Sequence, residues 1–135
     1  MQTSESLRET LLAFYEHWTA SDAASFDDFV SADVTTVIGT ADDEWFTGRE
    51  QLRSGYGWDG LRLEGHAPEA WEHGDMGWAA DRPTMHVDGV GPIRTRFTGV
   101  FRRERGRWRL VLSHFSVGVP DEEVAELQRR WLRSG

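Results

Sequence analysis

The side chains with the clearest chemical potential stand at the end of one predicted strand. His114 and Ser116 close an alternating row that begins with Trp108, Leu110 and Leu112. Two polar groups are an unusual way to end an apolar row. Because histidine titrates near neutral pH, it can give or take a proton there. We therefore take His114 as a candidate acid or base, and Ser116 as a candidate contact to a substrate oxygen.

Two residues on a neighbouring predicted strand could complete such a site. Asp81 lies in an otherwise apolar stretch and could orient His114, while His86 is a second candidate contact to substrate oxygen. A histidine held by a carboxylate suits dehydration or aldol-type cyclisation without a cofactor. Structural roles are the alternatives. His114 could be a buried histidine bonded to a serine or a carbonyl group, and Asp81 could pair with an arginine such as Arg96.

Large aromatic side chains are expected to form the walls of a ligand pocket. The chain has seven tryptophans, whose broad apolar faces suit a core or a cavity. Trp45 follows an acidic loop and is placed to close over a pocket mouth. Packing in an ordinary core is the alternative for the other rings. The expected pocket lining is Trp18, Trp45, Phe46, Tyr56, Trp71, Trp78, Phe97 and Ser116.

The composition excludes several kinds of chemistry. The 135 residues contain neither cysteine nor lysine, which removes disulfides, cysteine nucleophiles and lysine Schiff bases. The net charge of -8 argues against nucleic-acid or anionic-membrane partners. The five histidines show no close metal-ligand spacing. We expect no metal and no cofactor, and, since no long apolar run or signal-peptide pattern follows Met1, a cytoplasmic location.

The elements that position these groups follow from the hydrophobic periodicity. A first helix capped at Thr3 or Ser4 carries a stripe from Leu7 to Trp18, and a short helix is expected over residues 22–30. A strand over 34–38, a loop over 39–46 and a helix over 48–56 follow. Strands are expected over 61–73, over 76–87, and in a hairpin over 93–119 that turns at 104–107.

A closing helix begins near Pro120 and is expected to bury one apolar stripe, formed by Val124, Leu127 and Trp131. The arginines between residues 94 and 109 are expected to form a solvated strand edge and a dimer contact. Helices that precede a run of antiparallel strands indicate a single α+β domain over residues 1–135. We expect a curved antiparallel sheet wrapped around the N-terminal helices with a pocket inside.

Several segments resemble the SnoaL-like members of the nuclear-transport-factor-2-like superfamily. They are the first-helix stripe, residues 33–35 (DVT), residues 46–50 (FTGRE), and residues 108–111 (WRLV) with His114 and Ser116. A narrower resemblance to bacterial SnoaL-like domains rests on residues 43–46, 77–83 and 114–120. The resemblance implies a cone-shaped α+β barrel with a deep pocket, and commonly a homodimer joined through the outer face of the sheet.

This resemblance does not fix one activity, because the superfamily contains isomerases, dehydratases, cyclases, ligand-binding domains and association modules. Its ketosteroid isomerases need a carboxylate base where this chain has Ile38, which cannot take a proton. Tyr15 on the first helix could take the role that a tyrosine has in those isomerases. Two functions therefore stay open: a pocket protein that acts on an apolar small molecule as a cofactor-independent isomerase, dehydratase or cyclase, or a non-catalytic ligand-sensing or association domain.

Overall fold

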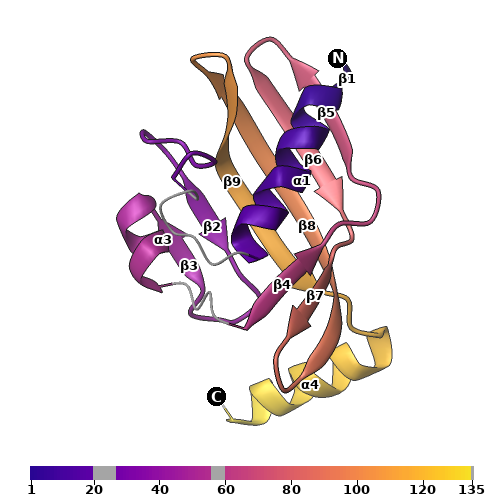
Figure 1. Ribbon diagram of the computed structural model, residues 1–135. Coiled ribbons are helices and arrows are strands. Elements are labelled where there is room, and N and C mark those ends of the chain that lie inside the picture. The colour runs from indigo at the N-terminus through magenta and orange to yellow at the C-terminus, as the bar shows by residue number, and fades with distance from the viewer. Residues whose placement is uncertain (20–26, 56–59, 135) are drawn as a thin grey trace.

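One long helix lies against the concave face of a curved sheet in the computed structural model of the chain, which describes residues 1–19, 27–55 and 60–134 (Figure 1). This helix, α1 (Glu5–Thr19), begins where the Ser4 hydroxyl accepts a hydrogen bond from the Leu7 amide. Its predicted stripe is confirmed, because Leu7, Leu11, Phe14 and Trp18 are all buried.

The predicted α+β class is confirmed, and the strands form one large, unclosed sheet. All neighbouring strands run antiparallel except β2 and β9, which run parallel. The two-residue turn at Arg105 and Gly106 joins the long strands β8 and β9, as predicted. The strand order is β1 (Gln2–Thr3), β5 (Glu69–His73), β6 (Met76–Asp81), β8 (Gly91–Glu104), β9 (Arg107–Val117), β2 (Thr36–Ile38) and β3 (Trp45–Thr47).

Two strands of the prediction are each divided in the structure. The segment 61–73 forms β4 (Leu61–Glu64) and β5, and the segment 76–87 forms β6 and β7 (Thr84–Val87). Pro83 lacks an amide hydrogen and so cannot extend the ladder of β6. Instead its carbonyl accepts a hydrogen bond from the Thr95 amide, and β7 pairs with β8 and β4.

Three further predictions concern the first half of the chain. The last two residues of the predicted loop 39–46 belong to β3. The Gly39 amide donates a hydrogen bond to the Glu44 carbonyl, and Trp45 pairs with Ile38 across the two strands. Helix α3 (Arg49–Gly55) matches the predicted helix 48–56, whose last residue lies outside the described ranges. Of the predicted helix 22–30, residues 22–26 also lie outside them, residues 27–29 form a turn, and Val30 bridges to Leu110.

A β-bulge at Val111 changes the direction of every side chain that follows it on β9. Phe101 pairs with Leu110, but Val100 pairs with Leu112, so Val111 is an extra residue on β9. One extra residue turns the following side chains to the opposite face. The predicted single row from Trp108 to Ser116 is therefore wrong. Trp108, Leu110, Ser113 and Phe115 are buried, whereas Leu112, His114 and Ser116 lie on the outer face.

Aromatic rings fill the space between α1 and the sheet. The rings of Trp18 and Phe115 lie 5.6 Å apart, those of Phe97 and Phe115 lie 5.0 Å apart, and those of Tyr15 and Phe97 lie 6.0 Å apart. These separations are typical of edge-to-face or tilted packing in a dense core. In the parts of the chain that the structure describes, the centre of the cone is therefore packed with side chains.

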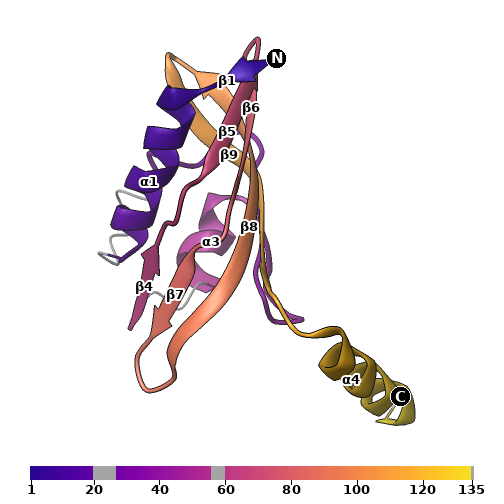
Figure 2. The same ribbon diagram turned by 90° about the vertical axis from the view of Figure 1, so that its right-hand side faces the viewer.

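The C-terminal helix α4 (Asp121–Ser134) stands apart from the rest of the molecule. It projects from the end of β9, on the side of the sheet opposite α1 (Figure 2). None of its residues is buried, so the predicted burial of Val124, Leu127 and Trp131 is wrong for a single copy of the chain.

Candidate functional site

A buried carboxylate and a buried phenol meet where β6 ends. Asp81 is 8% exposed, and the Tyr15 hydroxyl donates a hydrogen bond of 3.1 Å to its Oδ2. The Arg82 amide donates to Oδ1 at 2.7 Å, and the His66 amide donates to Oδ2 at 3.4 Å. Helix α1 thus supplies the phenol, and the strand end supplies the carboxylate.

Arg96 does not pair with Asp81, although the sequence allowed that alternative. Its Nε instead donates to the Ser116 hydroxyl at 3.1 Å on the outer face. Within residues 1–19, 27–55 and 60–134, no arginine or histidine side chain lies within ion-pair distance of the Asp81 carboxylate. A buried carboxylate without a cation must rely on its hydrogen bonds.

Burial raises the pKa of Tyr15 well above its ordinary value, and the negative charge of Asp81 and its hydrogen bond act in the same direction. The phenol therefore keeps its proton throughout the neutral range and remains a hydrogen-bond donor. A neutral donor that is fixed against a carboxylate orients that carboxylate without neutralising it.

The pair adjoins a hollow of about 440 Å³, which we call the Asp81 pocket. Its wall carries the exposed guanidinium groups of Arg82 and Arg96, and no described carboxylate lies within ion-pair distance of either. A carboxylate that can take a proton, beside cations that can stabilise a negative oxygen, suits proton removal next to a carbonyl group. The lining consists of His66, Ala67, Glu69, Ala80, Asp81, Arg82, Arg96, Phe97 and Thr98.

His114 and Asp81 are not brought together. His114 is exposed on the outer face of β9, between Thr98 of β8 and Ile38 of β2, whereas the Asp81 side chain reaches α1 on the inner face. Ser116 shares the outer face with His114. The roles of His114 as acid or base and of Ser116 as a substrate contact stay predictions, and the bulge at Val111 separates both residues from the Tyr15–Asp81 pair.

His86 lies on β7 and pairs with Glu64 instead of Asp81. Its Nε2 is 2.9 Å from the Glu64 carboxylate, and that hydrogen bond lowers the pKa of Glu64. The histidine that lines the Asp81 pocket is His66, whose Nε2 is 2.9 Å from the Thr84 hydroxyl. No motif in the sequence distinguishes His66 from the other histidines. Its place follows from the break between β4 and β5, which a single continuous strand over 61–73 conceals.

The residues of the predicted aromatic lining do not lie together in the structure. Phe97 lines the Asp81 pocket, while Trp18 is buried in the core and Phe46 packs against it. Trp71 and Trp78 are cross-strand neighbours and are half-buried. Trp45 is 64% exposed, and its predicted closure over a pocket mouth stays a prediction. The remaining predicted residue, Tyr56, lies outside the described residues.

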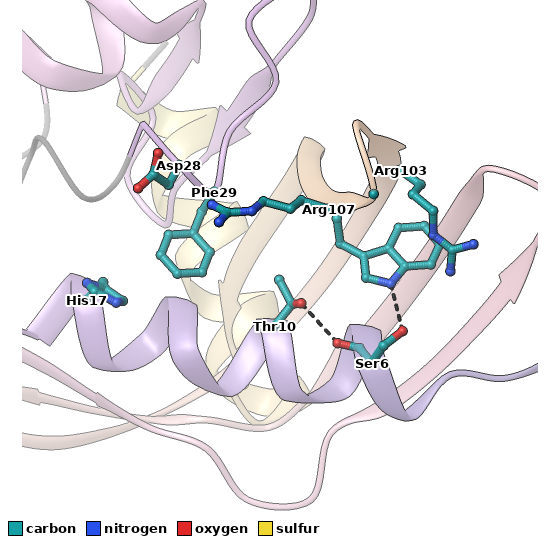
Figure 3. A pocket seen from close by; sticks show the side chains of 9 residues that line it. Ser6, Thr10, His17, Asp28, Phe29, Arg103 and Arg107 are labelled. Atoms are coloured by element: carbon teal, nitrogen blue, oxygen red, sulfur yellow. Dashed lines mark hydrogen bonds between the residues drawn. The ribbon is translucent and has the colours of Figure 1, made fainter.

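A larger hollow of about 550 Å³ lies between α1 and the tip of the β8–β9 hairpin (Figure 3). Its side chains already bind one another. The Trp108 ring donates to the Ser6 hydroxyl at 3.0 Å, and the Arg103 guanidinium stacks over the same ring at 4.4 Å. No buried acid–base pair adjoins this hollow among the residues that line it. The lining is Ser6, Thr10, His17, Asp28, Phe29, Arg103, Gly106, Arg107 and Trp108.

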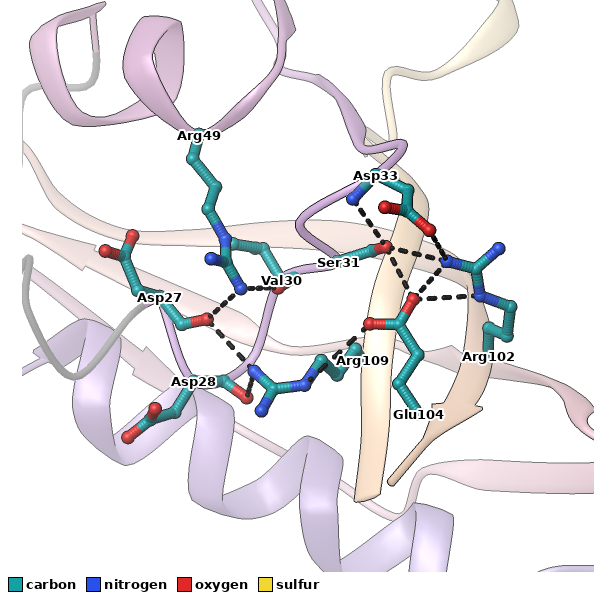
Figure 4. A network of polar contacts seen from close by, with 9 residues as sticks. All are labelled: Asp27, Asp28, Val30, Ser31, Asp33, Arg49, Arg102, Glu104 and Arg109. Atoms are coloured by element: carbon teal, nitrogen blue, oxygen red, sulfur yellow. Dashed lines mark hydrogen bonds and ion pairs between the residues drawn. The ribbon is translucent and has the colours of Figure 1, made fainter. Parts of the chain in front are cut away.

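A network of arginines binds the loop before β2 to the hairpin (Figure 4). Arg49 donates to the carbonyl groups of Asp27 and Val30, and Arg109 donates to that of Asp28. Arg102 is held by Glu104 and by Asp33. The expectation that the hairpin arginines form a solvated edge is therefore wrong for Arg102 and Arg109, which stabilise the fold.

The described ranges contain neither a metal-binding cluster nor a membrane-spanning helix. No group of three or more histidine, aspartate or glutamate side chains in these ranges is arranged to hold a metal ion. No helix within them is long and apolar enough to cross a membrane. The cytoplasmic location stays a prediction.

Solved structures place this architecture among cystatin-like, nuclear-transport-factor-2-like folds. A candidate dehydratase from Streptomyces avermitilis is 16% identical at a TM-score of 0.73, with 86% of this chain and 96% of that chain covered. A candidate calcium/calmodulin-dependent protein kinase II association domain from Xanthomonas campestris is 17% identical at 0.67, with 81% and 82% covered. A candidate ketosteroid isomerase from Shewanella frigidimarina is 14% identical at 0.66, with 80% and 92% covered.

At these identities the likeness concerns the fold alone. The family is defined by the sequence, because the model of the SnoaL-like domain matches residues 7–120. The chain therefore belongs to the SnoaL-like domain family. No curated protein sequence matches it closely enough to serve as a relative.

Proposed function

We propose that the chain binds a small organic molecule in the Asp81 pocket and catalyses proton transfer on it without a cofactor, as an isomerase, dehydratase or cyclase does. The observation that carries this proposal is the buried hydrogen bond between Tyr15 and Asp81 at the edge of a hollow. Membership of the SnoaL-like family supports it, and so does a fold shared with a candidate dehydratase and a candidate ketosteroid isomerase.

Each polar group has a distinct part in the proposed chemistry. The Asp81 carboxylate takes a proton from the carbon next to a substrate carbonyl group, and the electron pair moves onto the carbonyl oxygen. Arg82 and Arg96 stabilise the negative charge that develops on that oxygen. Asp81 then returns the proton to a different carbon in an isomerisation. Tyr15 is a positioning residue, because its hydrogen bond fixes the carboxylate.

A ligand panel tests whether the pocket binds at all. We expect a cyclic enone, a 3-oxo steroid or an aromatic polyketide fragment to raise the melting temperature, since a ligand that binds only the folded state stabilises it. The Arg96→Ala variant should weaken the effect, because the cation that faces the substrate oxygen is lost. Asp75→Ala, at the exposed β5–β6 turn, is the control and should respond like the wild type. No response of the wild type to any compound in the panel would contradict the proposal.

A second function, association of two copies, is favoured by a different observation. The outer face of the sheet carries an uncharged row that crosses four strands: Trp71, Trp78, Val100 and Leu112. Leu112 is 40% exposed and Trp45 at the far edge is 64% exposed. Exposed apolar patches of this kind mark interaction sites.

We propose that this outer face is a homodimer contact. Arg82 and Arg96 line the Asp81 pocket and also lie on the outer face, so this contact is an alternative to the first function. Light scattering should give twice the chain mass of 15.4 kDa at micromolar protein. A mass of one chain would contradict it.

A further inference from the structure

The C-terminal helix α4 is amphipathic, yet none of its residues is buried by the described part of its own chain. Val124, Leu127 and Trp131 are spaced three and four residues apart and therefore share one face of the helix. Trp131 is 62% exposed and the neighbouring Leu132 is 83% exposed. A helix with an apolar stripe gains most of its stability from packing that stripe against another apolar surface. In one copy of the chain, α4 lacks such a partner surface.

The outer face of the sheet also carries apolar side chains that the described residues leave exposed, Leu112 and Trp45, and the width of this face fits the helix. From β6 to β3 the sheet has four strand spacings, or about 19 Å at 4.8 Å each. Helix α4 has 14 residues and so is about 21 Å long. One helix can therefore cross the uncharged rows of this face from edge to edge.

The charges beside the two surfaces are complementary. The first turn of α4 carries three acids, Asp121, Glu122 and Glu123. The end of the outer face beside β7 carries Arg82, Arg94 and Arg96. No described acid lies within ion-pair distance of these three arginines. Opposite charges at the margin of an apolar contact fix its orientation and suppress wrong partners.

The helix does not reach the outer face of its own sheet. Only residues 118–120 separate it from β9, the amides of Glu123 and Val124 bond the Pro120 carbonyl, and α4 runs away from the sheet (Figure 2). We propose that α4 of one copy packs across the outer face of a second copy, with its acidic first turn at the partner's arginines. This inference rests on the proposed homodimer and names the element that makes it.

Disulfide trapping tests the contact directly, because the chain has no cysteine of its own. Trp131→Cys is combined with Trp45→Cys, Leu112→Cys or Trp78→Cys in three separate double variants of the full chain. Cysteines form a disulfide only when their Cα atoms come within about 7 Å. We expect at least one pair to give a covalent dimer on mild oxidation. Trp131→Cys with Asp75→Cys, at an exposed turn, is the matched control and should give none.

Three results would overturn the inference. The first is an oxidised disulfide within one chain, which would place α4 on its own sheet. The second is a native dimer that persists in the Leu127→Glu/Trp131→Glu variant, whose changes lie on residues that are not buried in one copy of the chain. That result would leave the homodimer intact but remove α4 from it, so the two proposals fail separately. The third is a monomer whose α4 binds vesicles of phosphatidylglycerol and phosphatidylcholine, which would assign the stripe to a lipid surface.

Charge reversal gives an independent check. Reversing the three α4 acids to arginine, or Arg82, Arg94 and Arg96 to glutamate, should each weaken the dimer at least tenfold. The chain that carries both reversals should recover it. Arg129→Ala, on the opposite face of α4, should leave the dimer unchanged. Failure of the double reversal to recover dimerisation, while each single reversal abolishes it, would contradict the proposed pairing.

Discussion

At the scale of single residues, Asp81 is the side chain whose surroundings differ most from what its charge prefers. It is nearly buried, it has no cation beside it in the described ranges, and three hydrogen bonds hold it. The sequence predicts Asp81 as unusual, since a carboxylate interrupts an apolar strand. Its partner Tyr15 is 66 residues away, and contacts at such separation leave no local signal.

The titration of Tyr15 is the sharpest prediction at this scale. The chain has two tyrosines, so Tyr56→Phe leaves Tyr15 alone. Because burial and Asp81 raise its pKa in the folded state, no tyrosinate absorbance should appear while the protein is folded. The proton held by the folded state also means that the free energy of unfolding falls as the pH rises above about 10, the ordinary tyrosine value. A reversible titration near pH 10 in the folded protein would contradict the buried hydrogen bond.

At the scale of elements, the sequence pattern predicted the helices and turns that depend on interactions between residues close together in the chain. The stripe of α1, the turn at Arg105 and Gly106, and the existence of α4 follow from spacing, capping and turn chemistry. The bulge at Val111 does not, because the apolar run 110–112 and the polar pair 113–114 are compatible with more than one pairing register. It arises from pairing with β8. This single extra residue places His114 and Ser116 on the outer face, opposite the face of Trp108 and Leu110.

The contact between α1 and β6 depends on Gly77. A Cβ atom at this position would lie 2.7 Å from the Leu7 side chain and 3.0 Å from the Trp71 carbonyl oxygen. Gly77→Ala should therefore lower the free energy of unfolding by about 1–3 kcal/mol in a urea titration. Gly118→Ala, where nothing lies within 4 Å, should change it by about 0.5 kcal/mol or less. Equal effects of the two substitutions would show that α1 does not pack closely on β6.

At the scale of the whole molecule, two apolar surfaces distinguish this chain from a self-contained domain. The rings between α1 and the sheet cover the inner face. On the outer face and on α4, by contrast, the described residues leave apolar side chains such as Leu112 and Trp131 exposed. The sequence shows that β9 and α4 carry apolar residues on the relevant faces. It cannot show which of those faces a second copy covers, because burial between chains and burial within a chain leave the same pattern.

The most direct test of the proposed proton transfer is hydrogen–deuterium exchange at the carbon next to a carbonyl group. Cyclic enones, 3-oxo steroids and β-hydroxy ketones are incubated with the protein in deuterium oxide and followed by proton nuclear magnetic resonance. The wild type should speed exchange of at least one compound, and Asp81→Asn should slow that exchange at least about hundredfold while the fold persists. Exchange that is equally fast with Asp81→Asn, or no faster than in buffer for every compound, would contradict the role of Asp81 as the base.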